Sequence, residues 1–333
     1  MRNRNNFDFL RFLFSFLVVI GHAILLSRKE EFQNDFLASL PLYGVFSFFI
    51  ISGFLVFGSY ERLQNLRKYT ENRLRRILPA YVFVVSFFAF FLYFFSDAAP
   101  YFNAQWLKYL ISNLTFLNFL EPCLPGVFMN NWLCAVNGSL WTIKIELMFY
   151  MFIPLLYLGI KSLTRVQKNW VLGSVYALSL AYFLIMQHLG KEFLAKQLPG
   201  NLFYFASGIL VYINLDFFKK WKNYLVLPAL LIVVLEKLFL GFTFLFPLAW
   251  AVVLFWFAFS KIPLQNFARY GDFSYGIYLV HFPIIQLFIQ EGWYNEHAFV
   301  GLFLTFLIIV FFSIFLWNFI EKPFLRKKNY SKT

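Results

Sequence analysis

Charge is scarce in this sequence of 333 residues, in which only 14% of the residues are charged and 61% are hydrophobic. Soluble domains carry about 25% charged residues, so the composition excludes an ordinary soluble domain. No stretch is polar enough to form a separate soluble domain, and no internal repeat, low-complexity tract or Pro- or Ser-rich linker interrupts the chain. We therefore expect a single membrane domain over residues 1–333.

Cysteine and the patterns of common cofactor sites are also scarce. The two cysteines, Cys123 and Cys134, fall in the connection 97–138. They either pair as a disulfide in an oxidising compartment or stay as unpaired thiols in a packed loop. No His, Cys, Asp and Glu group has metal-ligand spacing, and no Gly-rich phosphate loop is present. We expect no metal site.

Apolar runs, by contrast, recur along the whole chain, and each is long enough to cross a bilayer. Backbone groups must be satisfied inside lipid, and the ten-residue alternation of a barrel is absent, so these runs should be helices. The sequence predicts an all-α transmembrane bundle of about ten helices. Their expected ranges are 8–27, 41–59, 78–96, 139–158, 170–187, 199–215, 223–240, 242–260, 272–290 and 298–320.

The net charge of +13 is unevenly placed. Every other connection is basic, and 21 of the 29 Lys and Arg residues fall on one side of the predicted bundle. The positive-inside rule places that side, and both termini, in the cytoplasm. We expect a protein of the cytoplasmic (inner) membrane with no nucleic-acid partner. The terminal charges in this set are Arg2, Arg4, Lys322, Arg326, Lys327, Lys328 and Lys332.

Ionisable residues inside membrane spans are costly, so each is a functional candidate. In the range 8–27, Arg11 and His22 share one helix face about 16 Å apart along the axis. Asp8 and Ser15 lie near the same stripe, one turn either side of Arg11. In the alternative interpretation, Arg11 extends to the cytoplasmic surface and His22 is a buried, hydrogen-bonded structural residue. The shared face favours function.

A second polar face belongs to the range 139–158. Ser139, Thr142, Glu146 and Tyr150 follow at spacings of three, four and four, so they lie on one side of the helix. Glu146 lies about 10 Å from the outer end, a depth similar to that of His22. A carboxylate there would orient and charge-balance the imidazole.

The range 272–290 places Ser274, Tyr278 and His281 on one stripe. Hydrogen bonding between helices is the expected role of the tyrosine, and His281 is a weaker catalytic candidate than His22. The outer connection 97–138 is long and rich in Asn, Pro and Trp. It either lines an acceptor site or serves as a lid or packing element.

Arg73, Arg75 and Arg76 immediately precede Leu78-Pro79, where we expect a helix to start. Positive charge that holds a loop in the cytoplasm would explain them in part. Arginine side chains also bind phosphate through paired hydrogen bonds, and helix N-termini attract anions. The cluster therefore predicts a site for a phosphate-bearing cytoplasmic substrate.

Six blocks of this sequence, in order, resemble the motifs of acyltransferase family 3. The resemblance covers nearly the whole chain, and each block alone is weak, but six at these spacings are specific. The first is Asp8-Phe9-Leu10-Arg11 followed by His22, and the second is Phe48 to Phe54, which includes Ser52 and Gly53. The others are Arg73 to Tyr81, Ser139-Leu140-Trp141 to Glu146, Phe273 to His281 with Tyr278, and Glu321-Lys322-Pro323.

The resemblance implies ten helices, an acyl-coenzyme A donor on the cytoplasmic side and a carbohydrate acceptor on the other side. Many members of that family acetylate surface polysaccharides, including lipopolysaccharide O-antigen. Some carry a fused extracytoplasmic esterase-like domain. We expect this chain to lack one, which favours direct transfer to the acceptor.

Residues and resemblance together suggest a mechanism. Arg73, Arg75 and Arg76 anchor the phosphates of acetyl-coenzyme A. His22 is the general base for attack by a sugar hydroxyl, Glu146 holds the imidazole, and Arg11 stabilises the thioester or its oxyanion. A covalent acyl-histidine relay is equally compatible with the sequence.

Two other classes of protein agree less well with the sequence than an acyltransferase does. A transporter or flippase of a glycan or lipid intermediate usually shows internal repeats and paired broken helices, and the sequence has neither. A structural or assembly subunit would carry few intramembrane charges.

Overall fold

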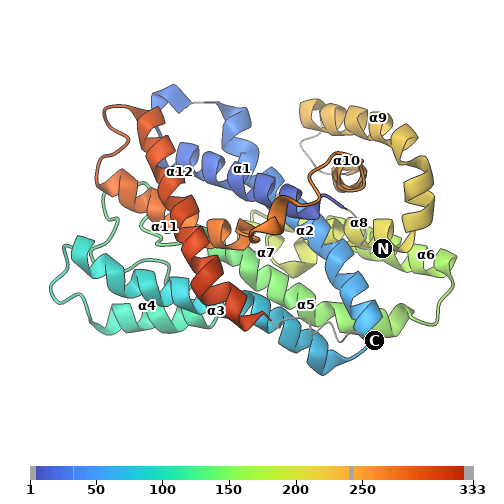
Figure 1. Cartoon of the computed structure of the whole chain (residues 1–333), viewed down its shortest axis with the longest axis horizontal. Helices are drawn as coiled ribbons and strands as arrows, with labels where there is room; N and C mark the ends of the chain where they lie inside the picture. Colours follow the sequence, from blue (N-terminus) through green and yellow to red (C-terminus); the bar gives the residue numbers. More distant parts are fainter. Residues whose placement is uncertain (1–4, 33, 240–243, 326–333) are drawn as a thin grey trace. The chain divides into compact units, whose positions relative to one another are not determined.

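The structure is a computed structural model, and it describes residues 5–32, 34–239 and 244–325. These ranges consist of helices joined by turns and loops, of which the connection between α3 and α5 is the longest (Figure 1). The longer helices are α1 (Phe7–Ser27), α2 (Asp35–Leu63), α3 (Leu66–Phe91), α4 (Ala104–Leu114), α5 (Trp141–Ile160), α6 (Arg165–His188), α8 (Leu202–Ile213), α9 (Leu215–Phe239), α10 (Phe246–Ala258), α11 (Ser274–Gln290) and α12 (Ala298–Phe315).

Each of the ten predicted ranges overlaps one of these helices, so the all-helical fold class is confirmed over the described residues. Six helical stretches there are long and apolar enough to cross a membrane, and they contain α1, α2, α3, α5, α6 and α12. The chain is therefore an integral membrane protein. Membrane crossing by α8, α9, α10 and α11 remains a prediction. So does the cytoplasmic placement of the termini, because Arg2, Arg4, Arg326, Lys327, Lys328 and Lys332 lie outside the described residues.

The chain forms two compact units, which we describe separately. Unit 1 comprises Met1–Phe14, Tyr43–Tyr69 and Ile145–Arg269, and unit 2 comprises Ser15–Leu42, Thr70–Lys144 and Tyr270–Thr333. The unit boundaries fall inside α1, α2, α3 and α5, so these four helices contribute to both units.

Unit 1 is held by close helix packing and by caps at helix ends. The backbones of α2 and α8 meet at two glycines: an added Cβ at Gly53 would overlap the Phe205 carbonyl, and one at Gly208 would overlap the Ile50 carbonyl. Small residues commonly let membrane helices approach in this way. At the start of α10, the buried Glu236 carboxylate accepts the backbone N–H of Phe246 at 2.8 Å.

Gly53 lies in the second of the six sequence blocks described above. Its close packing predicts that a larger residue at this position lowers the stability of the fold. Gly53→Ala should lower the free energy of unfolding by about 1–3 kcal/mol, because the new methyl group has no room against α8. Thermal unfolding in detergent measures the effect. Gly159→Ala on α5 is the control, because an added Cβ there meets nothing within 4 Å. Equal unfolding temperatures for the two variants would contradict this prediction.

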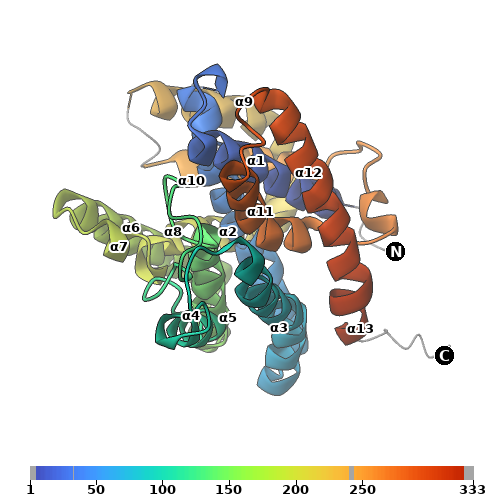
Figure 2. The ribbon, with the colours of Figure 1, turned by 90° about the vertical axis from the view of Figure 1, so that its left-hand side faces the viewer.

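In unit 2, α3 packs on α4, and α11 packs on α12 (Figures 1 and 2). The buried Tyr81 hydroxyl donates to the Asn113 carbonyl at 2.7 Å and so joins α3 to α4. Gly276 of α11 lies against Ser313 of α12, again without room for a Cβ.

The start of α3 corrects one prediction. The helix begins at Leu66, because the Asn65 side chain accepts the Lys68 backbone N–H at 2.9 Å as an N-terminal cap. Pro79 lies inside α3 rather than at its first turn. Arg73, Arg75 and Arg76 are therefore helical residues, and the part of the phosphate argument that placed them at a helix N-terminus is wrong.

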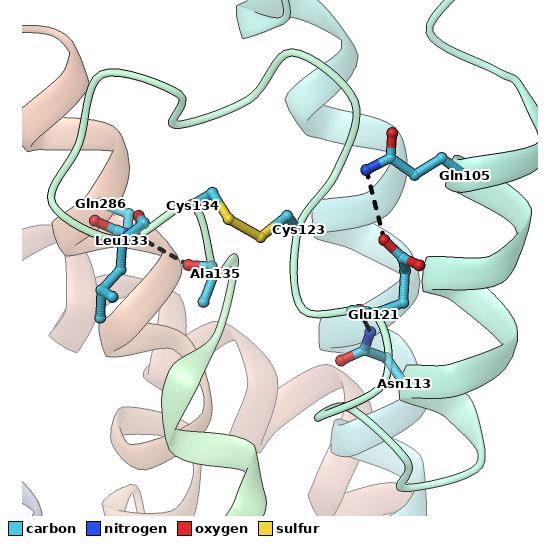
Figure 3. The surroundings of a disulfide bond; sticks show 8 residues. All are labelled: Gln105, Asn113, Glu121, Cys123, Leu133, Cys134, Ala135 and Gln286. Carbon is cyan, nitrogen blue, oxygen red and sulfur yellow. Dashed lines mark hydrogen bonds between the residues drawn. A yellow bond between two sulfur atoms is a disulfide. The ribbon is translucent and has the colours of Figure 1, made fainter.

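The connection between α3 and α5 is an ordered structure that contains α4 and a disulfide. Cys123 and Cys134 are bonded, with Cα atoms 5.3 Å apart (Figure 3). The Gln286 side chain of α11 donates to the carbonyls of Leu133 and Ala135 at 2.6 and 3.0 Å. These two hydrogen bonds hold the segment that contains Cys134 against α11. Of the two alternatives that the sequence left open, the structure selects the disulfide.

The disulfide predicts a labelling pattern in intact cells. Both cysteines should resist a thiol-reactive maleimide until a reductant is added, and then both should react, because disulfides persist in oxidising compartments. Mass spectrometry of the peptide that contains both residues reads the result. Labelling without reductant would mean that the thiols are free in the cell and would refute the pairing.

Candidate active site

Two histidines that lie far apart in the sequence meet in unit 2. Nδ1 of His22 on α1 is 2.8 Å from Nε2 of His281 on α11. Their rings stack with centroids 5.0 Å apart and an angle of 15° between planes. Phe282 packs edge-on against the His22 ring, with centroids 5.4 Å apart. His281 is fully buried, whereas His22 retains some exposure.

The hydrogen-bond partners determine where the protons lie in the neutral pair. Nδ1 of His281 is 2.7 Å from the Tyr278 carbonyl oxygen, which only accepts, so Nδ1 must donate. Nε2 of His281 is then the acceptor, and Nδ1 of His22 donates to it. The remaining ring nitrogen of His22, Nε2, carries an unprotonated lone pair. This nitrogen is suited to accept a proton or to act as a nucleophile.

The residues before α5 hold the helix that carries His281. Pro283 has no N–H, so it leaves the Leu279 carbonyl without its usual helical donor. The Asn137 side chain donates to that carbonyl at 2.8 Å. The Tyr278 hydroxyl lies 2.5 Å from the Thr142 hydroxyl and donates to the Ser139 carbonyl at 3.2 Å.

Other predicted site residues fall in the same region or close to it. Ser139 donates to Asn137 at 2.7 Å, and Trp141 is the first residue of α5. Gly138 leaves space for the ring of Phe282, because an added Cβ would come within 2.7 Å of that ring. The segment around Ser139 therefore packs and hydrogen-bonds against α11.

Unit 1 contains a second polar group, around Glu146. Its carboxylate accepts from the Tyr150 hydroxyl at 2.5 Å and from the Ser52 hydroxyl at 3.2 Å. Arg11, in the first half of α1, pairs with Asp8 at 3.5 Å. The helix α1 is continuous, so Arg11 and His22 lie on one helix as predicted. The predicted contact between Glu146 and His22 would join the two units and stays a prediction.

The three arginines of α3 have different surroundings. Arg75 pairs with Glu71 at 2.7 Å in a half-exposed contact. Arg76 pairs with Asp272 at 2.5 Å and lies 3.7 Å from the Glu321 carboxylate. Asp272 also accepts from the Ser274 hydroxyl at the start of α11. Arg73 precedes Arg76 by three residues, so the two lie on the same side of α3.

The Glu321 carboxylate is the most deeply buried member of this cluster. Its side chain is 2% exposed, and neither of its oxygens has a hydrogen-bond partner. The positive charge of Arg76, 3.7 Å away, offsets the cost of burying its negative charge. Glu321 ends the π-helical turn Leu316–Glu321. Such turns are rare and often occur at functional sites.

The family of the chain follows from its sequence. The acyltransferase family 3 model, described as "Acyltransferase domain", matches residues 4–320, which is nearly the whole chain. The chain belongs to acyltransferase family 3. The protein is therefore a membrane acyltransferase, and the predicted family is confirmed.

Two curated relatives are similar over most of their length. The O-acetyl transferase of Shigella phage Sf6 is 23% identical, and the alignment covers 99% of this chain and 98% of the relative. Nodulation protein 10 of Rhizobium leguminosarum bv. viciae is 25% identical, with 87% of this chain and 85% of the relative covered. No solved structure matches this acyltransferase.

The sequence prediction ranked His281 below His22 and did not pair them. Two residues in the sequence indicate the position of His281. Pro283 leaves the Leu279 carbonyl without its helical donor, and the Asn137 amide donates to that carbonyl instead. Within the described ranges, no three His, Cys, Asp or Glu side chains gather closely enough to hold a metal ion.

Proposed function

We propose that this acyltransferase is an O-acetyltransferase that moves an acetyl group from acetyl-coenzyme A to a sugar hydroxyl of a cell-envelope polysaccharide such as lipopolysaccharide O-antigen. The observation that carries the proposal is the His22–His281 pair, which leaves one basic nitrogen in a helix of a family 3 acyltransferase. The printed name of the phage Sf6 relative supports acetyl as the group and oxygen as the acceptor atom. The donor is on the cytoplasmic side of the inner membrane, and the acceptor is on the outer side.

The direct reaction balances around His22 Nε2. The acceptor hydroxyl gives its proton to Nε2 while its oxygen attacks the thioester carbonyl. The resulting oxyanion collapses, the carbon–sulfur bond breaks, and coenzyme A leaves as a thiolate that takes up the proton. The products are the acetyl ester and free coenzyme A. His281 is a positioning residue here, because it holds the His22 proton on Nδ1 and leaves Nε2 free.

Charged residues complete the proposed site. Arg11 stabilises the thioester or the oxyanion, and Glu146, which is held by Ser52 and Tyr150, balances the charge that forms on His22. We assign the phosphate contacts of the donor to the arginine cluster of α3 that the sequence predicts, Arg73, Arg75 and Arg76. The half-exposed ion pair between Arg75 and Glu71 is weak, so the Arg75 guanidinium can leave Glu71 and bind a phosphate of the donor. Arg76 also holds Asp272 and Glu321 in place.

A second route uses the same nitrogen as a nucleophile. Nε2 would attack the thioester and release coenzyme A, and the acyl-histidine would then pass its acetyl group to the sugar. Brief incubation of purified protein with radiolabelled acetyl-coenzyme A, without acceptor, separates the two routes. Label that stays on the peptide containing His22 supports the relay. Its absence, with full transfer on later addition of acceptor and fresh donor, supports direct attack.

The function is tested by expressing the protein in a host whose envelope polysaccharide is not acetylated. We expect isolated polysaccharide to gain ester-linked acetate, measured by mass and by its loss in mild alkali. Membrane vesicles given labelled acetyl-coenzyme A should produce the same ester. A vesicle preparation that moves glycan across the membrane without forming an ester would refute the enzyme and favour the transporter.

A further inference from the structure

An exposed tryptophan lies on a rigid loop near the C-terminal ends of the helices that carry both histidines. The Trp132 side chain lies in the connection closed by the Cys123–Cys134 disulfide, and the residue is 54% exposed. The Arg28 guanidinium lies over the Trp132 ring, 5.5 Å from its centroid. All of these residues belong to unit 2.

The loop that carries Trp132 is fixed at several points. Gln286 donates to carbonyls on both sides of Cys134 (Figure 3). The Asn131 side chain donates to the Gln286 backbone carbonyl at 2.9 Å. On the other flank, the Phe128 N–H donates to Gln290 at 3.0 Å, and the Phe128 side chain is fully buried. An exposed ring on so constrained a loop loses little conformational freedom when a ligand binds.

Both partners of the pair are tied to the proposed catalytic helices. Arg28 follows His22 by six residues at the end of α1, a rise of about 9 Å. Gln286 follows His281 by five residues on α11, a rise of about 7.5 Å. Trp132 therefore lies beyond the histidine pair, towards the end that the topology places outside, at a separation that a few sugar units would span.

Arg28 has a backbone conformation that reinforces this placement. Its φ is 50°, in the left-handed region that L-residues with side chains rarely adopt. The position just after a helix usually carries glycine for this reason. Here an arginine occupies it and lies on the ring, while the neighbouring Lys29 donates to Asn295 at 3.0 Å.

We infer that Trp132 and Arg28 form a subsite for a sugar ring of the polysaccharide acceptor, a few units along the polymer from the sugar that is acetylated. The C–H face of a pyranose is complementary to the negative face of an aromatic ring. The Arg28 guanidinium and the exposed Asn130 amide supply hydrogen bonds to sugar hydroxyls. This inference rests on the proposed function and adds to it the recognition of a polymeric acceptor.

The test compares acceptor affinity with donor chemistry. Purified protein in lipid nanodiscs receives acetyl-coenzyme A and the alkali-deacetylated envelope polysaccharide on which wild-type activity was established. We expect Trp132→Ala to raise the KM for polysaccharide about tenfold. The kcat and the slow hydrolysis of acetyl-coenzyme A without acceptor should stay within about twofold, because the substitution leaves the histidine pair in place.

Two further variants decide between recognition and structure. Trp132→Phe keeps an aromatic face and should stay close to wild type, whereas Arg28→Ala should raise the same KM. Trp170→Ala is the matched control, because Trp170 is also exposed, at 75%, but belongs to unit 1. It should change none of these constants.

The outcomes separate the inference from the function on which it rests. A wild-type protein that acetylates nothing would refute the proposed function, and the subsite with it. Normal wild-type activity with an unchanged KM for Trp132→Ala would overturn the subsite alone. Loss of thermal stability in lipid for Trp132→Ala, again with an unchanged KM, would show that Trp132 is a lipid-interface anchor.

Discussion

Replacing His22 by alanine should reduce acyl transfer about 10²–10⁴-fold while the protein still folds and inserts, because the substitution removes the basic nitrogen. His281→Ala should lower kcat by about 10²-fold or more, because His22 then loses the acceptor that keeps its proton on Nδ1. His281→Gln should recover much of that loss, since the amide oxygen can accept from His22. Acetyl transfer to polysaccharide, at equal membrane expression, measures all three.

The glutamine variant is the decisive one for the role of His281. A purely structural histidine would make Ala and Gln similarly defective, and both would lower the unfolding temperature. His297→Ala provides a control, because His297 lies in the turn before α12 and is not a member of the pair. Full activity of His22→Ala would refute the proposed catalytic centre, whatever the behaviour of His281.

Arg76→Ala should lower the free energy of unfolding by about 3–5 kcal/mol, the largest stability effect that we expect from a single charge. The substitution removes the positive charge that pairs with Asp272 and lies 3.7 Å from the buried Glu321 carboxylate. Arg75→Ala removes a half-exposed pair with Glu71 and should cost about 0–1 kcal/mol. Thermal unfolding in detergent, together with the amount of protein in membranes, compares the two.

A compensated variant tests the cause of that instability. Arg76→Met combined with Asp272→Asn and Glu321→Gln removes the positive charge and both negative charges together, so it should recover most of the lost stability. If Arg76→Ala and Arg75→Ala unfold at the same temperature, the cluster does not hold unit 2 together. In that case the role of Arg76 would be limited to the phosphate site that the sequence predicted.

The helices illustrate what local sequence information supports. Each predicted range overlapped a helix, because the preference of an apolar segment for lipid depends mainly on its own residues. The helix α3 starts earlier than the sequence predicts, because Asn65 caps it and Pro79 lies inside it rather than at its first turn. The helix α4, in the connection between α3 and α5, was not predicted because that segment is too short to span a membrane.

The sequence alone determined that this protein is a helical membrane protein, that polar residues interrupt its spans, and that its motifs resemble those of acyltransferase family 3. Only the tertiary structure decided which of those polar residues meet. His22 and His281 are 259 positions apart in the sequence. Arg76 pairs with Asp272 and Glu321, which lie on two other segments of the chain. Such pairings depend on how each helix is rotated and which neighbours it packs against, and a periodic pattern records the face of a helix but not its partner.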